Sequence, residues 1–522
     1  MQPTLITRLL AVGLTGLIHP LCFPSFDLGW LAWLTLVPLH WALTGLPPRQ
    51  AFRWGWMAGV IAFSGTITWV ITAMNQYGQV PFAISSLLML LLATYLGLFV
   101  GAYAWGYARF QKKHPDVLWL SAPALWVALE YLRTYAFSGL PWALLGYSQY
   151  KWLTLIQIAD ITGVYGVSFL VVMANVVISQ CLTWITTKNR TTATLNPLRP
   201  IAGLAATLTL VLSYGFWQVH HQHSLDQATS TLTIGVVQAN IEQGHKWDER
   251  YRDETMDRYT RLSLQAGRNT DLLIWPEAAT PFLFEQEPEY QGEIRRIVQA
   301  TNSPLLFGSP TVRFHPDGRP YLFNSAFLLD REGQIANRYD KRHLVPFGEY
   351  IPLKSILFFL EKLVVGIGDF QEGQGPMTMT VAIPRLDSAL RFGVPICFEV
   401  IFPDLVRRMA QEGANVLITI TNDAWFGDSA APYQHFGMVV FRAVENHLAF
   451  ARAANTGISG FIGPDGAILE ATPVFTEQAK TATIPLRHTL TFYAQFGDVF
   501  SWICVILTGI LMIGSRLHAR PS

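Results

Sequence analysis

The stretch Leu390 to Met409, LRFGVPICFEVIFPDLVRRM, decides how the polar half of this chain folds. Its apolar run from Leu390 to Ile396 predicts a buried strand, and Cys397 follows at a sharp turn. A helix comes next, because Pro403 suits a first helical turn and Asp404 suits the positive end of the helix dipole. A cysteine at such a turn lies on the rim of a sheet, where backbone N–H groups favour the reactive thiolate. A lone cysteine is more often a small buried hydrophobe, so the rest of the chain must decide.

The composition indicates a membrane protein. Of the 522 residues, 51% are hydrophobic and only 14% are charged, with a mean hydropathy of +0.28. A soluble chain carries about 25% charged residues. The net charge of +1 gives no sign of a nucleic-acid partner. The four cysteines (Cys22, Cys181, Cys397 and Cys504) have neither a disulfide nor a zinc spacing, so we expect no metal.

Eight apolar segments are predicted to cross the membrane. Most reach the roughly 20 residues that a helical span needs. The first is not a signal peptide, because no small-residue cleavage site follows it before Pro20. The first two are interrupted, by His19-Pro20 and by Pro38. The expected spans are 5–22, 26–44, 54–73, 82–108, 117–137, 163–186, 200–217 and 497–515.

The charges between these segments predict a topology. One side has 11 basic residues: Arg8, Arg49, Arg53, Arg109, Lys112, Lys113, Lys188, Arg190, Arg199, Arg516 and Arg520. The opposite side has only Arg133 and Lys151. Positive charge marks the cytoplasmic side, so both termini are expected there. Seven spans before residue 220 then place the following polar region outside the cytoplasm.

The domain boundaries follow from these changes in composition. Residues 1–219 form the predicted bundle of about seven transmembrane helices, and 487–522 form a closing transmembrane helix with a cytoplasmic tail. Residues 220–230 are a linker, whose histidines are a solvated exit from the bilayer rather than metal ligands, because no acidic partner is near. In 231–486, short β-branched runs alternate with helical patterns, which predicts a sheet covered by helices.

Three more stretches accompany Cys397. In DLLIWPEAATP, Glu277 ends an apolar strand, where a carboxylate among apolar neighbours can act as a general base. In RYDKRHLVPFGEY, Lys341 can stabilise an oxyanion, and Glu349 can orient it. In NDAWFG, Trp425 and Phe426 either wall a substrate pocket or form an ordinary core rim. Each stretch alone is also compatible with an ordinary surface loop.

Together, WPE with Glu277, YDK with Lys341 and ICFE with Cys397 stand in chain order. This arrangement resembles the Glu–Lys–Cys triad of the nitrilase, or carbon–nitrogen hydrolase, superfamily. The resemblance covers about 231–486 and implies an αββα sandwich. It assigns Glu277 as general base, Lys341 as oxyanion stabiliser and Cys397 as nucleophile.

The whole-chain plan resembles the apolipoprotein N-acyltransferases, a family of bacterial inner-membrane enzymes. The likeness extends to QGHKW with Trp247, a substrate-binding candidate, to LVPFGEYIP with Glu349, and to GLPWALLGYSQ at 139–149. Glu399 matches the family and is expected to support Cys397 or Lys341. Where a known member has a tyrosine after the nucleophile, this chain has Phe398, so a hydroxyl cannot be essential there and packing remains.

This resemblance implies an acyl transfer in two steps through a Cys397 thioester. The donor is a membrane phospholipid, and the acceptor is the α-amino group of the diacylglyceryl-cysteine that begins an apolipoprotein. No cofactor is implied, the catalytic domain is expected in the periplasm, and we expect a monomer in the lipid bilayer. Residues 353–370 are predicted to be either a membrane-dipping lid or an ordinary core helix.

Two other functions are compatible with parts of the chain. A membrane-tethered nitrilase-type amidase would hydrolyse small amides, but one span would be enough for a tether. A transporter with an outer binding domain is the second alternative, but its binding domain would not need the ordered Glu–Lys–Cys set. The predicted bundle also lacks the paired charges within the membrane that a transport path would use. Glu130, the clearest carboxylate within the bundle, lies one turn from Arg133, which favours structural pairing over function.

Overall fold

A computed structural model describes residues 3–186, 197–226, 229–268, 270–351 and 370–517. The chain divides into two compact units. Unit 1 comprises Met1–Val70, Phe82–Val219 and Phe496–Ser522. Unit 2 comprises Ile71–Pro81 and His220–Gln495. The short segment Ile71–Pro81 thus groups with His220–Gln495 and not with the helices on either side of it in the chain.

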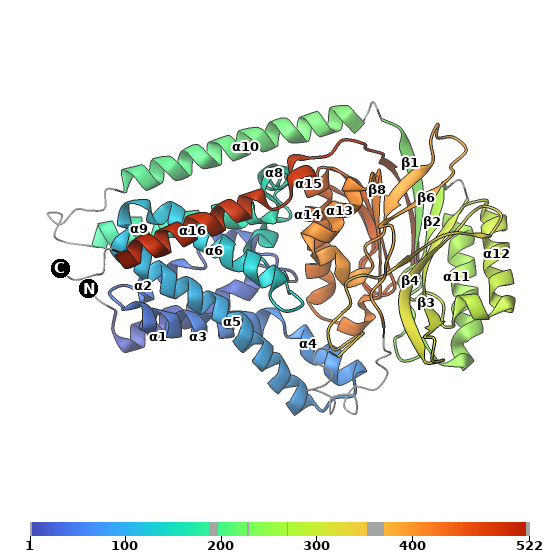
Figure 1. The fold of residues 1–522 in the computed structure, drawn as a ribbon, viewed down its shortest axis with the longest axis horizontal. Coiled ribbons are helices and arrows are strands. Elements are labelled where there is room, and N and C mark those ends of the chain that lie inside the picture. Colours follow the sequence, from blue (N-terminus) through green and yellow to red (C-terminus); the bar gives the residue numbers. More distant parts are fainter. Residues whose placement is uncertain (1–2, 187–196, 227–228, 269, 352–369, 518–522) are drawn as a thin grey trace. The chain divides into compact units, whose positions relative to one another are not determined.

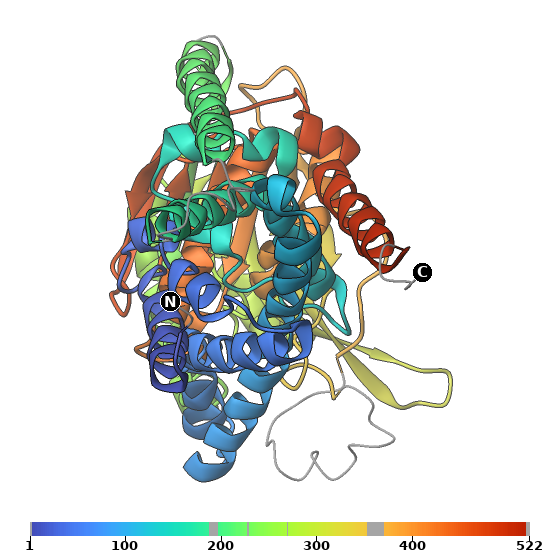
Figure 2. The same cartoon turned by 90° about the vertical axis from the view of Figure 1, so that its left-hand side faces the viewer.

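Unit 1 is helical. Its α1, α3 and α5 pack side by side, as do α6 and α9 (Figures 1 and 2). The longer helices are α1 (Leu5–Leu21), α3 (Pro48–Thr66), α5 (Phe82–Lys113), α6 (Leu118–Tyr135), α9 (Val164–Thr186), α10 (Leu198–Asp226) and α16 (Val499–Leu517). The shorter ones are α2 (Val37–Ala42), α7 (Leu153–Ile156) and α8 (Ala159–Thr162). Two helices continue into unit 2, α4 (Trp69–Thr72) from Ile71 and α10 from His220.

At least three described helices are long and apolar enough to cross a membrane. They are Phe82–Lys113, Val164–Ile185 and Leu198–Asp226. The pair Pro48–Thr66 and Trp69–Tyr77 makes a fourth if it forms one span with a 53° bend. Leu5–Leu21 and Val499–Ser515 are apolar but shorter. The membrane character is thus confirmed in outline, and the figure of about eight spans stays a prediction.

The expected second span, 26–44, is not one continuous helix. It consists of a 3-10 helix, Gly29–Trp33, and then α2. At the break, the side chain of Asn175 in α9 accepts a hydrogen bond from the Leu36 N–H at 2.8 Å and donates one to the Ala32 carbonyl at 2.9 Å. Pro38 lies in the first turn of α2, where it interrupts no helical hydrogen bond. The buried Asn175 side chain therefore satisfies the backbone groups that the break would otherwise leave without a hydrogen bond in an apolar environment.

Two further expectations need adjustment. Helix α10 continues to Asp226, so the first part of the predicted 220–230 linker is helical. The GLPWALLGYSQ segment is buried inside unit 1, where Glu130 accepts a hydrogen bond from the Leu145 N–H at 2.7 Å. The carboxylate thus holds this loop, which agrees with a structural role for Glu130.

Unit 2 is the expected αββα sandwich (Figure 1). Its two six-stranded sheets have the orders β12-β1-β2-β3-β4-β5 and β11-β10-β9-β8-β7-β6. The first sheet contains β1 (Thr231–Gln238), β2 (Leu272–Ile274), β3 (Leu305–Phe314), β4 (Pro320–Leu329), β5 (Ile335–Asp340) and β12 (Gln478–Pro485). The second contains β6 (Thr378–Val381), β7 (Leu390–Gly393), β8 (Val416–Thr421), β9 (Phe450–Ala454), β10 (Gly460–Ile462) and β11 (Ile468–Ala471).

Helices cover the outer faces of both sheets. Helices α11 (Arg252–Ala266) and α12 (Pro288–Thr301) join the parallel strands β1, β2 and β3. Helices α13 (Pro403–Gln411) and α14 (Ala431–Asn446) join the parallel strands β7, β8 and β9. A short α15 (Phe492–Phe496) follows β12. Strands β8 and β9 are buried at every position, as expected for parallel strands covered on both faces.

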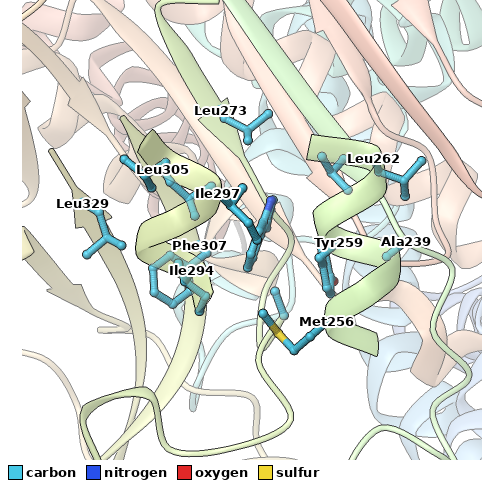
Figure 3. Close-up of a cluster of buried hydrophobic side chains, with 14 of the residues drawn as sticks. Ala239, Met256, Tyr259, Leu262, Leu273, Ile294, Ile297, Leu305, Phe307 and Leu329 are labelled. Atoms are coloured by element: carbon cyan, nitrogen blue, oxygen red, sulfur yellow. The ribbon is translucent and has the colours of Figure 1, made fainter. Parts of the chain in front are cut away.

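A hydrophobic core fixes α11 and α12 on the first sheet (Figure 3). Met256, Tyr259 and Leu262 of α11 face Ile294 and Ile297 of α12 above the strands. These positions recur every three or four residues, which is the helical period. Leu273 of β2 belongs to the same core, and β2 ends three residues before Glu277, one of the predicted catalytic residues.

Candidate active site

Cys397 lies where β7 gives way to a helix, as its stretch predicts. The chain leaves β7, Ile396 pairs with Ile420 of β8, and a 3-10 turn at Cys397–Ile401 precedes α13. Cys397 itself has a φ of +51°, in the left-handed region that residues other than glycine rarely adopt. Such a conformation costs roughly 1–2 kcal/mol, so the surroundings must hold it.

Glu277 follows β2 and is buried, with 7% of its surface exposed. One carboxylate oxygen accepts hydrogen bonds from Asn324 Nδ2 at 2.7 Å and from Lys341 Nζ at 3.3 Å. The other accepts from the Asn422 backbone N–H at 2.9 Å. Its side chain is also hydrogen-bonded to the Cys397 thiol. The carboxylate is therefore oriented by three donors and directed at the Cys397 thiol.

Lys341 follows β5 and is 1% exposed. Its ammonium group lies 3.0 Å from a Glu349 carboxylate oxygen in addition to Glu277. Asn324, which lies on β4, donates one hydrogen bond to each of these carboxylates, at 2.7 Å in both cases. The predicted partnership of Glu349 with Lys341 is thus present in the structure. Asn324 completes a closed network of two carboxylates, one ammonium and one amide.

Glu399 ties the Lys341 loop to the Cys397 turn. One of its oxygens accepts from the backbone N–H groups of Arg342 at 2.7 Å and His343 at 3.1 Å. The other accepts from the Ile396 N–H at 2.7 Å. Glu399 therefore contacts the backbone beside Lys341 and the backbone beside Cys397, the two residues that the sequence pattern offered as alternative partners. Phe398 packs its ring against Phe402 at a centroid distance of 5.2 Å.

The electrostatics of the site set the resting protonation states. Burial acts to raise the pKa of Glu277, but Lys341 and the Asn324 hydrogen bond outweigh it and hold that pKa below its usual range. Burial raises the pKa of Cys397, and the Glu277 charge adds to this. The expected stabilisation of the thiolate is therefore absent at rest. The site pairs a protonated thiol with an ionised carboxylate, which suits proton transfer from Cys397 to Glu277.

The sequence patterns do not identify two side chains of this site, Asn324 and Lys246. Asn324 lies in a strand-like run, NSAFLLD, in which only its polarity among apolar residues marks it. Lys246, next to Trp247, is 3% exposed and donates a hydrogen bond to the Glu277 carbonyl oxygen at 3.2 Å. Burial lowers the pKa of Lys246 to about 8, against the charge of Glu277. The lysine in QGHKW is thus a second buried cation of the site.

The predicted substrate-binding aromatics lie outside this buried centre. Trp247 is 49% exposed and Trp425 is 44% exposed. Trp425 contacts Tyr77 edge-to-face at 5.9 Å, within unit 2. The Phe426 ring lies 6.5 Å from the ring of buried His435. Trp247 and Trp425 therefore have exposed rings, whereas Phe426 is half-buried. The predicted lid, 353–370, lies outside the described residues except at its last position.

Comparisons with known proteins cover nearly the whole chain. Residues 15–177 match the family described as apolipoprotein N-acyltransferase N-terminal domain, and 233–491 match carbon-nitrogen hydrolase. The chain is 41% identical to apolipoprotein N-acyltransferase of Geobacter metallireducens, over 98% of this chain and 95% of that protein. The enzymes of the same name from Haemophilus ducreyi and Pseudomonas aeruginosa are 33% and 31% identical, over 97% and 99% of this chain and 97% of each relative.

A solved amidase from Nesterenkonia sp. is similar to half of the chain. It is 22% identical, covers 51% of this chain and 92% of its own length, and has a TM-score of 0.36. Such a distant likeness does not bear on the function.

Proposed function

The chain belongs to the apolipoprotein N-acyltransferase family, and from this premise we propose how its residues perform the acyl transfer. The enzyme is an acyltransferase of lipoprotein maturation. We propose that a membrane phospholipid donates the acyl chain, that Cys397 carries it as a thioester, and that the α-amino group of an apolipoprotein diacylglyceryl-cysteine accepts it. The observation that carries this proposal is the buried network of Glu277, Lys341 and Cys397.

In the first step, Glu277 takes the thiol proton of Cys397. The sulfur attacks the ester carbonyl of the phospholipid, and the negative charge on that oxygen is held by Lys341 and backbone N–H groups. The tetrahedral intermediate collapses, the C–O bond to glycerol breaks, and the lysophospholipid oxygen receives the proton from Glu277. The products are a thioester on Cys397, an ionised Glu277 and a free lysophospholipid.

In the second step, the free amine of the apolipoprotein attacks the thioester carbonyl. Glu277 accepts a proton from the attacking nitrogen, and Lys341 again faces the oxyanion. The C–S bond breaks, an amide forms, and the Cys397 sulfur regains its proton from Glu277. The same three side chains thus serve both half-reactions, and a single chain supplies them all, so we propose that the enzyme acts as a monomer.

We propose a location in the bacterial inner membrane, with both termini in the cytoplasm and residues 231–486 in the periplasm. The bias of basic residues between the apolar segments supports this topology. It requires the broken segment 26–44 to cross the membrane, which the hydrogen bonds of Asn175 at the break permit. Alkaline phosphatase fused after residue 230 should be active, because it folds in the periplasm. Activity of a cytoplasmic reporter at the same site would contradict the topology.

Intact mass spectrometry of the purified protein after exposure to phospholipid tests the chemistry. We expect a fatty-acyl adduct that hydroxylamine removes and that Cys397→Ala does not form. An adduct that persists in Cys397→Ala would refute the nucleophile assignment. Hydrolysis of small amides by a protein that forms no acyl adduct would instead favour the amidase.

A further inference from the structure

A buried polar cluster lies directly behind the nucleophile and is not used by the mechanism above. It consists of Asp423, which follows β8, His435 of α14 and Arg452 of β9. Asp423 and Arg452 are 0% exposed, and His435 is 1% exposed. Arg452 Nη2 lies 2.7 Å from Asp423 Oδ2, and His435 Nδ1 lies 3.0 Å from Asp423 Oδ1. No substrate can reach these side chains.

The cluster touches Cys397 at two of its atoms. His435 Nε2 lies 3.2 Å from the Cys397 carbonyl oxygen. The Thr421 hydroxyl, 3.0 Å from Asp423 Oδ1, is also hydrogen-bonded to the Cys397 thiol. The cluster therefore reaches both the backbone and the sulfur of the one residue in this turn that has a left-handed conformation.

The hydrogen-bond partners fix the direction of the key contact. A carbonyl oxygen can only accept, so His435 Nε2 must carry a proton and donate it to Cys397. Burial, together with Arg452, lowers the pKa of His435, which favours the neutral ring. With that proton on Nε2, Nδ1 of a neutral ring accepts from Arg452 Nη2 at 3.1 Å, whereas Nδ1 of a protonated ring donates to Asp423 Oδ1 at 3.0 Å. In both forms Nε2–H faces the Cys397 carbonyl oxygen, so the contact with the nucleophile's backbone does not depend on the charge of the ring.

We propose that His435, held by Asp423 and Arg452, is a positioning residue that sets the peptide unit between Cys397 and Phe398 for catalysis. This inference rests on the proposed role of Cys397 as nucleophile. The carbonyl of that peptide accepts from His435, and its N–H belongs to the residue after the nucleophile, which is a common oxyanion donor. A hydrogen bond to the carbonyl holds the plane of the peptide and strengthens its N–H as a donor.

The role predicts a specific pattern among variants. His435→Phe keeps the ring shape but removes the donor, whereas His435→Gln retains an N–H that can reach the Cys397 carbonyl. We expect single-turnover thioester formation to fall about 10- to 100-fold in His435→Phe, with the phospholipid KM nearly unchanged, because an oxyanion donor is misplaced. His435→Gln should recover most of that rate. Asp423→Asn should fall between them.

Glu445→Gln is the matched control for lost stability. Glu445 lies on the same helix, is 0% exposed, and pairs with Arg442 at 2.7 Å rather than with the nucleophile. The Glu445→Gln variant should have a lower melting temperature, but its folded form should form the thioester at the wild-type rate. If His435→Phe keeps the wild-type rate, or if His435→Gln is as slow as His435→Phe, the positioning role is wrong.

A second readout needs no lipid and separates this inference from the proposed function. The rate at which iodoacetamide alkylates Cys397 reports its alignment with Glu277. We expect alkylation to slow about 10-fold in His435→Phe and to recover in His435→Gln, because proton transfer needs the thiol in register. Equal alkylation rates in all three proteins would overturn the positioning role. Absence of an acyl adduct on the wild type would count only against the proposed function.

Discussion

At the scale of single residues, the proposed mechanism moves a proton within a closed set of buried groups. Cys397 is protonated at rest, and Glu277 is ionised. The sequence pattern predicts a thiolate, because backbone N–H groups at a turn after a strand can stabilise the negative charge on the sulfur. It cannot show that distant segments bury the thiol and bring a carboxylate against it. In the proposed mechanism Glu277 therefore generates the thiolate during the reaction, because the raised pKa of Cys397 disfavours a thiolate at rest.

The amide of Asn324 predicts a shift in pH dependence. Its hydrogen bond lowers the pKa of Glu277, so its loss in Asn324→Ala should raise that pKa. More of the base is then protonated at a given acidic pH, and the acid limb of the thioester rate should move to higher pH. Single-turnover rates between pH 4 and 8 test this. Asn337→Ala on β5, which loses a hydrogen bond to the Thr380 carbonyl outside the site, should leave the limb in place.

The hydrogen bonds of Glu399 predict that the isosteric substitution Glu399→Gln is destabilising. Its carboxylate faces backbone N–H groups at both oxygens, so the amide of Glu399→Gln must point a donor at a donor. We expect a loss of about 1–3 kcal/mol in the free energy of unfolding and a slower thioester step. Denaturant titration of the purified protein measures the first. Tyr339→Phe, which removes only the 2.9 Å hydroxyl contact to Glu399, should cost less, and an equal cost would contradict this account.

The limits of residue prediction have a physical cause. Glu277, Lys341 and Cys397 follow strands that the sequence pattern locates, so their convergence at strand ends can be predicted. Asn324 lies inside a strand of the same sheet, and Lys246 in a loop, where sequence spacing gives no sign of what they face. Their roles depend on pairing between β4 and its neighbours, which only the three-dimensional structure supplies.

At the scale of elements, strands and helices of the catalytic unit follow their sequence patterns closely. The run around Val416–Thr421 is apolar throughout and forms a fully buried strand, and Pro403 begins α13 as expected. The failure is the segment 26–44. Its apolar residues suggest one helix, but a long-range side chain from α9 satisfies the backbone at a break. Hydropathy shows that a segment is apolar, but it carries no information about a distant side chain that bonds to the backbone of that segment.

Asn175 therefore predicts a large local effect. Asn175→Leu keeps the volume but leaves the Leu36 N–H and the Ala32 carbonyl without this partner in an apolar setting. We expect a loss of about 1–3 kcal/mol for each buried group left unpaired. Thermal unfolding in detergent micelles measures it. Thr207→Ala on α10, which loses a hydroxyl bond to the Gly203 carbonyl of its own helix at 2.8 Å, should lose less, and an equal loss would argue against the bridge.

At the scale of the whole molecule, the two units do not follow the chain in blocks. Ile71–Pro81 groups with the catalytic unit although apolar helices flank it on both sides. Composition alone could not show this, because the segment is short and is predicted as part of a span and its loop. The contact between Tyr77 and Trp425, and the closeness of Thr72 to Gly427, are its visible basis.

Gly427 provides the test of this grouping. A methyl group there would lie 2.9 Å from Thr72 Cγ2 and 3.2 Å from Gln76 Oε1. We expect Gly427→Ala to speed amide hydrogen exchange in 71–81, because the contact must open. Gly318→Ala is the control, since Gly318 also has a positive φ but has nothing within 4 Å of a new methyl group. Unchanged exchange in 71–81 for Gly427→Ala would show that the segment is held elsewhere.

The pairing of charges around Cys397 has a consequence for how the reaction responds to its medium. Lys246 and Lys341 lie among the carboxylates of Glu277, Glu349 and Glu399, so each charge that the proposed proton transfers create or remove has an opposite charge beside it within the protein. Bulk salt screens such buried groups little. The chemical step is thereby insulated from the ionic strength of its surroundings.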